Sequence, residues 1–373
     1  MITIISNNPR FYLMITILLI SNSVIAQNTV TNQDSTYKDK YLILPAISIS
    51  PETSLMLGGV VIRQFKPKLA GTETRSSTML LSAIYTLKNQ ILISFVPEII
   101  FPKESWILSG NHYLIYFPDK FWGVGPLTKN SDEMSVIFTQ LNLEQSFLKQ
   151  IKPNFYIGPQ IRWSRVTNVK FKDTDGNRIS PPEVNGVNGG TSAGLGFIIR
   201  WDKRNSLLTP TKDFYLDFSF LANPSFLGST YPYASFKLDG RKYFDLRNNG
   251  ETILAFQTVT RFTSGSPSFR DMSLIGGDKI MRGYYEGRFR DNNAAQMQAE
   301  LRQHIAGRFG FTLFSAVGNV WKHFGDFTIN NTQWAAGMGI RFNMNPGDTN
   351  NLRLDYGIGP HTSGFYLMFG EAF

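Results

Sequence analysis

Arrangements of residues that could carry catalysis or bind a metal ion are poorly supported in this sequence of 373 residues. Cysteine is absent, which excludes a disulfide scaffold, a cysteine-ligated zinc or iron–sulfur site and a thiol nucleophile. The DTDGN segment at 173–177 is faintly similar to a calcium loop, but its glycine comes too early and no glutamate follows at the required distance. We find no GxSxG, Walker or HExxH motif. The four histidines are scattered without metal-ligand spacing: His112, His304, His323 and His361. We therefore expect no catalytic residue, no metal, no cofactor and no enzyme.

Charged side chains recur instead on one face of segments in which apolar and polar residues alternate. The alternation is clearest at 214–220, 295–302, 334–343 and 352–358. Glu300 and Arg302 lie on the polar face of the second segment, and Arg353 lies on that of the last. Successive residues of a strand point to opposite faces, so each segment is predicted to be a strand with one apolar and one polar or small face. A soluble β-sandwich shows the same pattern, with its polar side in water.

The composition favours strands that face lipid on alternate residues. Charged residues make up 17% of the chain, against about 25% in ordinary globular domains. Aromatic residues make up 14% and there are 32 glycines, whereas the mean hydropathy of −0.14 excludes a polytopic helical membrane protein. The net charge is +9. Because the chain is predicted to be exported, anionic lipid headgroups or a solvated lumen fit this charge better than nucleic acid.

The N-terminal residues predict export. Arg10 precedes an apolar run of about ten residues, too short for a spanning helix, and Val24 and Ala26 suit the −3 and −1 positions of a cleavage site. We therefore expect a signal peptide at 1–26 and a flexible periplasmic lead at 27–40. The remainder, 41–373, is expected to form one outer-membrane β-barrel.

The alternating segments predict a closed, all-β, antiparallel barrel of sixteen transmembrane strands. The expected strands are 41–50, 55–65, 77–87, 90–100, 105–117, 134–148, 153–166, 191–201, 213–221, 231–244, 250–262, 295–305, 309–321, 333–343, 350–358 and 364–373. The three longest connections, 118–133, 167–190 and 263–294, each follow an odd-numbered strand, as external loops of such barrels do. The long turn near 66–76 is the exception.

The last residues alternate as well. Phe365, Leu367, Phe369 and Phe373 share one face, and Glu371 interrupts it. An alternating strand that closes on an aromatic residue is similar to the assembly signal of bacterial outer-membrane barrels. Phe369 and Phe373 are therefore expected to close the barrel and to carry this signal.

Five motifs resemble, in the right order, the C-terminal barrel of BamA/TamA-type assembly proteins, the bacterial surface antigen domain. They are WDKRN…PTKD (201–213), RGY within 276–287, ELR (300–302), LFSAVGNVW (313–321) and GMGIRFN…PGDTNNLRLDYG (337–357). Two positions depart from the family pattern, since Asp213 replaces a glycine and Ala316 replaces an aspartate. The N-terminal half of the chain shows general alternation alone.

The resemblance implies that the long loop between strands 11 and 12 folds into the lumen, where Arg282 would meet acidic residues of the wall. Gly283 would let the backbone pass closely, and Tyr284 would pack the loop tip. Alternation places Glu300 on the lumen side, so Glu300 is the main expected partner of Arg282, with Asp202 as a possible substitute for the missing acid at 316. The further lumen residues expected near them are Arg302 and Arg204.

The same resemblance implies an outer-membrane protein that aids insertion or translocation of protein or lipid. Members of the family carry periplasmic POTRA domains, whereas the 27–40 lead is too short for one, so we expect a member without them. The expected partners are outer-membrane lipid and lipopolysaccharide, together with unfolded outer-membrane clients or periplasmic proteins. The alternative is a pore or transporter for small solutes, its wet lumen lined by Arg200, Asp202, Glu300, Arg302 and Arg353. An outer-membrane lipolytic enzyme would need a nucleophile–base pair that the sequence lacks.

Overall fold

The computed structural model describes residues 39–71, 74–206, 209–344 and 351–373. The expected signal peptide at 1–26 and all but the end of the expected lead at 27–40 lie outside the described residues. Within the described ranges, no helix is both long enough and apolar enough to cross a membrane.

Strands make up most of the described chain, because apolar and polar side chains alternate along it with period two. The strands are β1 (Lys40–Ser50), β2 (Ser54–Phe65), β3 (Ser77–Thr86), β4 (Ile91–Ile100), β5 (Trp106–Gly110), β6 (His112–Phe121), β7 (Met134–Lys152), β8 (Phe155–Lys172), β9 (Gly190–Asp202), β10 (Asp213–Asn223), β11 (Tyr233–Asp245), β12 (Thr252–Gly265), β13 (Ser273–Ile275), β14 (Phe289–Asp291), β15 (Asn293–Ala306), β16 (Phe309–Trp321), β17 (Gln333–Asn343), β18 (Asn351–Gly359) and β19 (Thr362–Phe369). Short 3₁₀ turns occupy η1 (Pro102–Glu104), η2 (Asn130–Asp132), η3 (Ser225–Leu227), η4 (Phe324–Asp326) and η5 (Ile329–Asn331).

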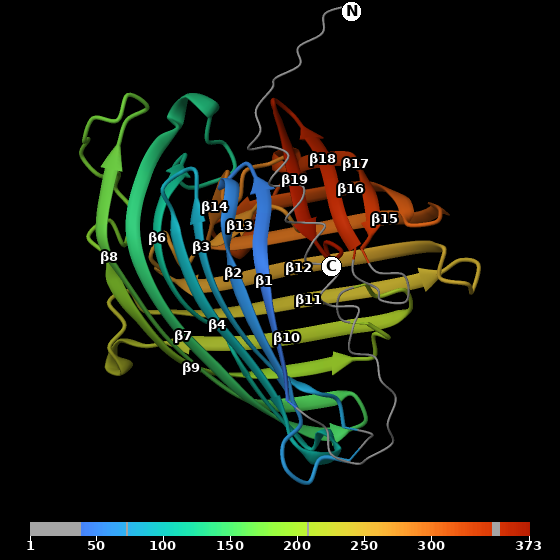
Figure 1. Cartoon of the computed structure of the whole chain (residues 1–373). Coiled ribbons are helices and arrows are strands. Elements are labelled where there is room, and N and C mark those ends of the chain that lie inside the picture. The colour runs from blue at the N-terminus through green and yellow to red at the C-terminus, as the bar shows by residue number, and fades with distance from the viewer. Residues whose placement is uncertain (1–38, 72–73, 207–208, 345–350) are drawn as a thin grey trace, which may run out of the picture. The chain divides into compact units, whose positions relative to one another are not determined.

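The large sheet closes into an antiparallel barrel, since its order returns from β19 to β1 (Figure 1). β5 and β6 both pair with β4 and with β7, and they are separated only by Asn111, whose amide donates to the carbonyl oxygen of Glu144. They therefore form one interrupted spanning strand. The barrel has sixteen spanning strands, which confirms the number predicted from the sequence. The short hairpin of β13 and β14 is a separate sheet.

Alternation separates the outer face of each strand from its inner face. Ile340, Leu354 and Phe369 are each about half exposed, at 55%, 42% and 53%. Their neighbours Arg341 and Arg353 are buried. The apolar side chains thus point outward and the charged ones inward, which confirms the register predicted for these three residues. Phe218, also predicted to point outward, packs its ring against the exposed rings of Phe197 and Phe236.

The connections differ in length between the two ends of the barrel. At one end the turns at 153–154, 246–251 and 307–308 are short, whereas the connections 66–76 and 203–212 at the same end are longer. At the other end the connections include 122–133, 173–189 and 266–292. Short turns are periplasmic and long loops external in outer-membrane barrels, so the first end is assigned to the periplasm. The predicted loops were somewhat too long, because β8 continues to Lys172 and β12 to Gly265.

The end of the chain departs from the prediction. β19 ends at Phe369, and Gly370 adopts a left-handed φ of 77°, which turns the chain away from the strand direction. Phe373 is consequently buried beside Tyr243 rather than on the outer face. The expectation that residues 364–373 form one closing strand is therefore wrong for its last four residues.

Candidate functional site

The long loop, residues 266–292, makes side-chain contacts with widely separated strands. Arg270 donates to the side-chain oxygen of Gln140 on β7, and Tyr285 donates to a carboxylate oxygen of Asp119 on β6. Arg282 contacts β15 and β18, on a distant part of the sheet. A segment that reaches both groups of strands passes across the interior. These contacts support the lumen position that the family resemblance implies.

Arg282 is fully buried and lies between two carboxylates. Its Nη1 donates to Oδ2 of Asp355 at 2.5 Å, and its Nη2 donates to Oε2 of Glu300. Its guanidinium carbon also lies 3.6 Å from the ring centroid of Phe314. Charge-assisted hydrogen bonds and a cation–π contact act together here, and burial keeps salt from screening them. The structure thus brings Arg282 and Glu300 together.

These residues belong to a larger ion network with equal numbers of arginines and acids. Its members are Arg282, Arg302, Arg341, Arg353, Asp278, Glu300, Asp355 and Glu371. Arg302 contacts Glu300 at 2.7 Å, and Arg341 contacts both Asp355 at 2.5 Å and Glu371 at 2.8 Å. Each charge therefore has an opposite neighbour, as a buried charge requires. The network joins the loop to β15, β17, β18 and the end of the chain, and it serves as an anchor.

Two glycines allow the loop backbone to reach the wall. Gly283 has a φ of 112°, which favours glycine, and it lies against Gly357 on β18. A Cβ atom on Gly357 would lie 2.4 Å from the carbonyl oxygen of Arg282, far inside van der Waals contact. The hydroxyl of Tyr366 accepts a hydrogen bond from the amide of Gly283 at 2.9 Å. Gly283 therefore allows the close passage that the motif implies.

The rest of the loop tip packs in an apolar cluster. Tyr284 is 2% exposed and lies with Met281 and Ala316 among the buried residues of this cluster. Ala316, at the position where the family has an aspartate, packs in this cluster and lies opposite Gln298 on β15.

Two of the predicted lumen partners do not join the network. Asp202 and Arg204 pair with each other at 2.8 Å near the turn between β9 and β10. The suggestion that Asp202 replaces the acid missing at 316 is therefore wrong, because Arg282 pairs with Glu300 and Asp355 instead. Asp213, which stands at a family glycine, has a left-handed φ of 69°, the conformation in which glycine would be unstrained.

Sequence reasoning did not assign four members of the network to it: Asp278, Arg341, Asp355 and Glu371. Asp355 and Arg341 both lie on the polar faces of alternating strands, so their inward direction was visible in the sequence. Alternation does not show which strands lie beside the loop, so it could not place β17 and β18 there. Glu371 was interpreted as an interruption of an outer face, but the turn at Gly370 brings it to Arg341.

A pair of carboxylates at the loop lies outside the spanning strands. Glu52, in the turn between β1 and β2, accepts a hydrogen bond from the backbone amide of Glu286 at 2.8 Å. Burial raises the pKa of the Glu286 carboxyl to about 7, and the negative charges of Glu52, Asp278 and Asp119 contribute in the same direction. Burial likewise raises the pKa of Glu52. This contact ties the loop to the strand pair that begins the barrel.

The chain and its fold are similar to known outer-membrane proteins. The Omp85 superfamily domain matches residues 76–373. The fold is similar to BamA from Haemophilus ducreyi lacking POTRA domains 1–3, with 11% identity, a TM-score of 0.61, and coverage of 95% of this chain and 78% of that one. It is also similar to CdiB from Acinetobacter baumannii, with 14% identity, a TM-score of 0.51, and coverage of 89% of this chain and 65% of that one. For CdiB from Escherichia coli the identity is 10% and the TM-score 0.56, with coverage of 90% of this chain and 64% of that one. The chain spans slightly less than two thirds of each CdiB chain. No curated protein matches it.

Proposed function

This chain belongs to the Omp85 superfamily of bacterial outer-membrane β-barrels, whose members are non-enzymatic transporters or assembly factors. On that premise we propose that it aids insertion or translocation of protein at the outer membrane. In this proposal an extended client strand enters the barrel wall between β1 and β19. Family membership alone does not specify this role. The evidence for it is the way in which the barrel closes between its first and last strands.

The seam between β1 and β19 is the observation that carries the proposal. Among the described residues, Ile49 and Leu367 are its one register pair, whereas β1 pairs with β2 along the whole of Lys40–Ser50. The hydroxyl of Ser48 adds one hydrogen bond to the carbonyl oxygen of Leu367, at 2.9 Å. A seam with so few backbone bonds opens at a lower cost than any neighbouring strand pair.

The edge of β1 that faces β19 is also suited to pairing with a further strand. Tyr41 and Ile43 are 65% and 76% exposed, and they lie on the part of β1 that extends past its register pair with β19. Unpaired backbone groups at a lipid-facing edge cost several kcal/mol each, which favours pairing with an incoming strand. Such β-augmentation derives its affinity from main-chain hydrogen bonds and therefore suits clients of differing sequence.

A disulfide across the seam tests this role. The chain has no native cysteine, so an Ile49→Cys/Leu367→Cys pair forms the single bridge, and opposed residues of neighbouring strands have the required separation. We expect oxidation to block insertion of an unfolded outer-membrane protein into liposomes that contain this barrel, and reduction to restore it. The matched control is Ile340→Cys/Leu354→Cys, which bridges the fully paired β17 and β18 and should leave insertion unchanged.

The alternative, a pore for small solutes, predicts a different result. Locking the seam would then leave single-channel conductance and solute uptake intact, and neither bridged variant would differ from the unmodified barrel in client insertion. Client insertion that persists with the seam oxidised would overturn the proposal.

A further inference from the structure

Lysine side chains and aromatic rings gather on the outer face of β5 and β7–β11 and of the connection after β9, at the end assigned to the periplasm. Four lysines each place the ammonium group 4.6–5.9 Å from the centroid of at least one aromatic ring. The lysines are Lys149, Lys152, Lys203 and Lys242, and the rings are those of Trp106, Phe155, Trp201, Phe214 and Phe244. None of the ion pairs found among the described residues involves these four lysines. Lysines that extend along aromatic rings at a membrane interface keep their charge at the level of the lipid headgroups.

A groove opens on the outer face beside this group, over β10, β11 and β12. It has a volume of 340 Å³, and its floor is Gly240, flanked by Leu216 and Thr258 on the neighbouring strands. A Cβ atom on Gly240 would meet Leu216 and Thr258 only at 3.6 and 3.4 Å, so the missing side chain leaves a furrow between them. Met297 continues the same row on β15.

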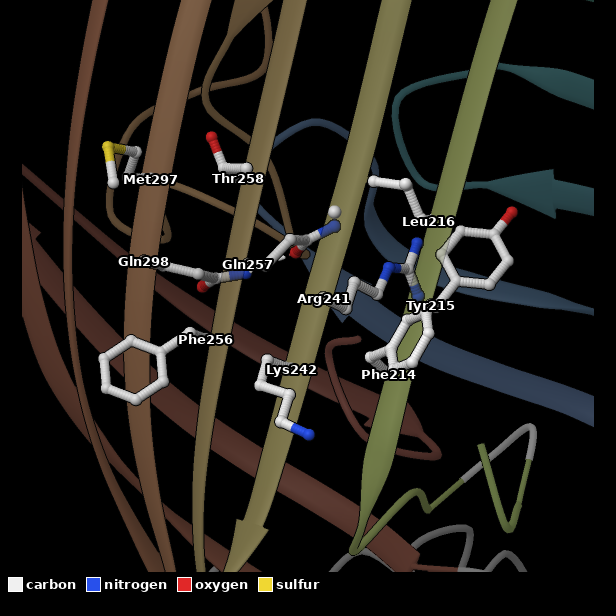
Figure 2. A pocket seen from close by; sticks show the side chains of 11 residues that line it. Phe214, Tyr215, Leu216, Arg241, Lys242, Phe256, Gln257, Thr258, Met297 and Gln298 are labelled. Carbon is white, nitrogen blue, oxygen red and sulfur yellow. Dashed lines mark hydrogen bonds between the residues drawn. The ribbon is translucent and has the colours of Figure 1, made fainter. Parts of the chain in front are cut away.

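The groove and the lysines meet at the next row toward the periplasmic end. Phe214, Lys242 and Phe256 are opposed on β10, β11 and β12, one outward position below Gly240. Figure 2 shows Phe214, Phe256 and Lys242 toward the arrowhead end of β11, with Thr258 and Met297 farther along the strands. The ammonium groups of Lys203 and Lys242 both lie within 6 Å of the ring centroid of Phe214. Two cations thus stand at the mouth of an apolar furrow.

We propose that this surface binds one phospholipid of the periplasmic leaflet with an anionic headgroup, its phosphate between Lys203 and Lys242 and one acyl chain in the furrow at Gly240. The furrow lies on the lipid-facing wall of an outer-membrane barrel, where a hydrocarbon chain is the available apolar occupant. The two unpaired ammonium groups at its mouth provide the complementary charge, since lysines near a membrane surface attract anionic headgroups. The site lies on the opposite side of the sheet from the ion network and apart from the seam, so it is separate from the proposed function.

Lipid binding by the full chain in detergent, followed by native mass spectrometry, tests this site. Dioleoyl-phosphatidylglycerol is the probe, and dioleoyl-phosphatidylcholine is the zwitterionic reference with the same acyl chains. We expect tighter binding of the first lipid, and we expect Lys203→Gln/Lys242→Gln to weaken it roughly 30-fold, since each lysine near the surface contributes about 1 kcal/mol. Gly240→Leu, which fills the furrow and keeps both charges, should weaken binding of both lipids.

The matched control removes two lysines elsewhere on the chain, Lys170→Gln/Lys322→Gln, which changes the net charge equally. It should bind phosphatidylglycerol as the unmodified protein does. The proposal is overturned if the two double variants lose affinity alike, if Gly240→Leu has no effect, or if phosphatidylcholine binds as tightly as phosphatidylglycerol. Preferential binding of lipopolysaccharide that the two lysines control would also overturn it, because the site would then belong to the other leaflet.

Discussion

Nη1 of Arg282 and Oδ2 of Asp355 are 2.5 Å apart, so β18 supplies the second carboxylate that holds the long loop. Ala316 occupies the position two strands away at which the family carries an aspartate, and it lies in the apolar cluster with Met281. Asp355 lies in the 337–357 motif that resembles the family pattern, and it gives the guanidinium a second anionic partner beside Glu300. Because Asp355 also binds Arg341 and Arg353, the loop is coupled to β17 as well as to β18.

Arg282→Ala should destabilise the barrel strongly. The substitution leaves Glu300 and Asp355 buried with one cation fewer, and breaking a buried pair from one side costs about 3–5 kcal/mol. The free energy of unfolding, measured by urea titration of the barrel in detergent, should fall by that amount. The control is Arg270→Ala in the same loop, whose side chain is 16% exposed and 3.6 Å from Asp119. Its ion pair is longer and its side chain is not fully buried, so this substitution should cost less than Arg282→Ala, and equal losses for the two variants would contradict the anchoring role of Arg282.

Gly357→Ala should release the loop from the wall without removing any charge. The added Cβ would lie 2.4 Å from the carbonyl oxygen of Arg282, so the two backbones must move apart, and we expect this to weaken the contact of Arg282 with Asp355. Trypsin should then cleave after Lys279 or Arg282 faster than in the unmodified protein. Gly59→Ala on β2, where a Cβ meets nothing within 4 Å, should leave cleavage unchanged.

Stability should depend on pH through Glu286. Its pKa is about 7 in the folded chain and ordinarily 4.5, so the folded chain binds the extra proton between these values. The free energy of unfolding contributed by Glu286 therefore falls as the pH rises from 4.5 to about 7, and it is level above that. In a heat-unfolding series, Glu286→Gln should match the unmodified protein at pH 4.5 and exceed it at pH 8. A constant difference across this range would show that the Glu286 pKa is not raised.

Leu354→Arg tests the outer face. Leu354 is 42% exposed near the middle of β18, and an arginine at mid-membrane depth costs about 2–4 kcal/mol. Trp334→Arg, at the start of β17 beside the external connection, should cost only about 0–1 kcal/mol. The two values come from unfolding titrations of the barrel folded into lipid vesicles, and a larger cost at position 334 would place the bilayer elsewhere along the strands.

The sequence alone determined which way most side chains point. Because a strand alternates with period two, Glu300 and Asp355 could be assigned to the inner face and Leu354 to the outer face before any strand was paired. The same periodicity, with the connections between segments, yielded sixteen spanning strands. The pairing of Arg282 with Glu300 came from the family resemblance together with this parity.

Only the tertiary structure decided which inward residues meet. Alternation assigns a side chain to a face, but closure of the barrel determines which distant strands lie opposite the loop, so the role of Asp355 required the fold. The turn at Gly370 depends on one left-handed residue, which carried Glu371 to Arg341 and Phe373 inward. The furrow at Gly240 likewise arises from the register of three strands, and register is a property of pairing that a single strand cannot specify.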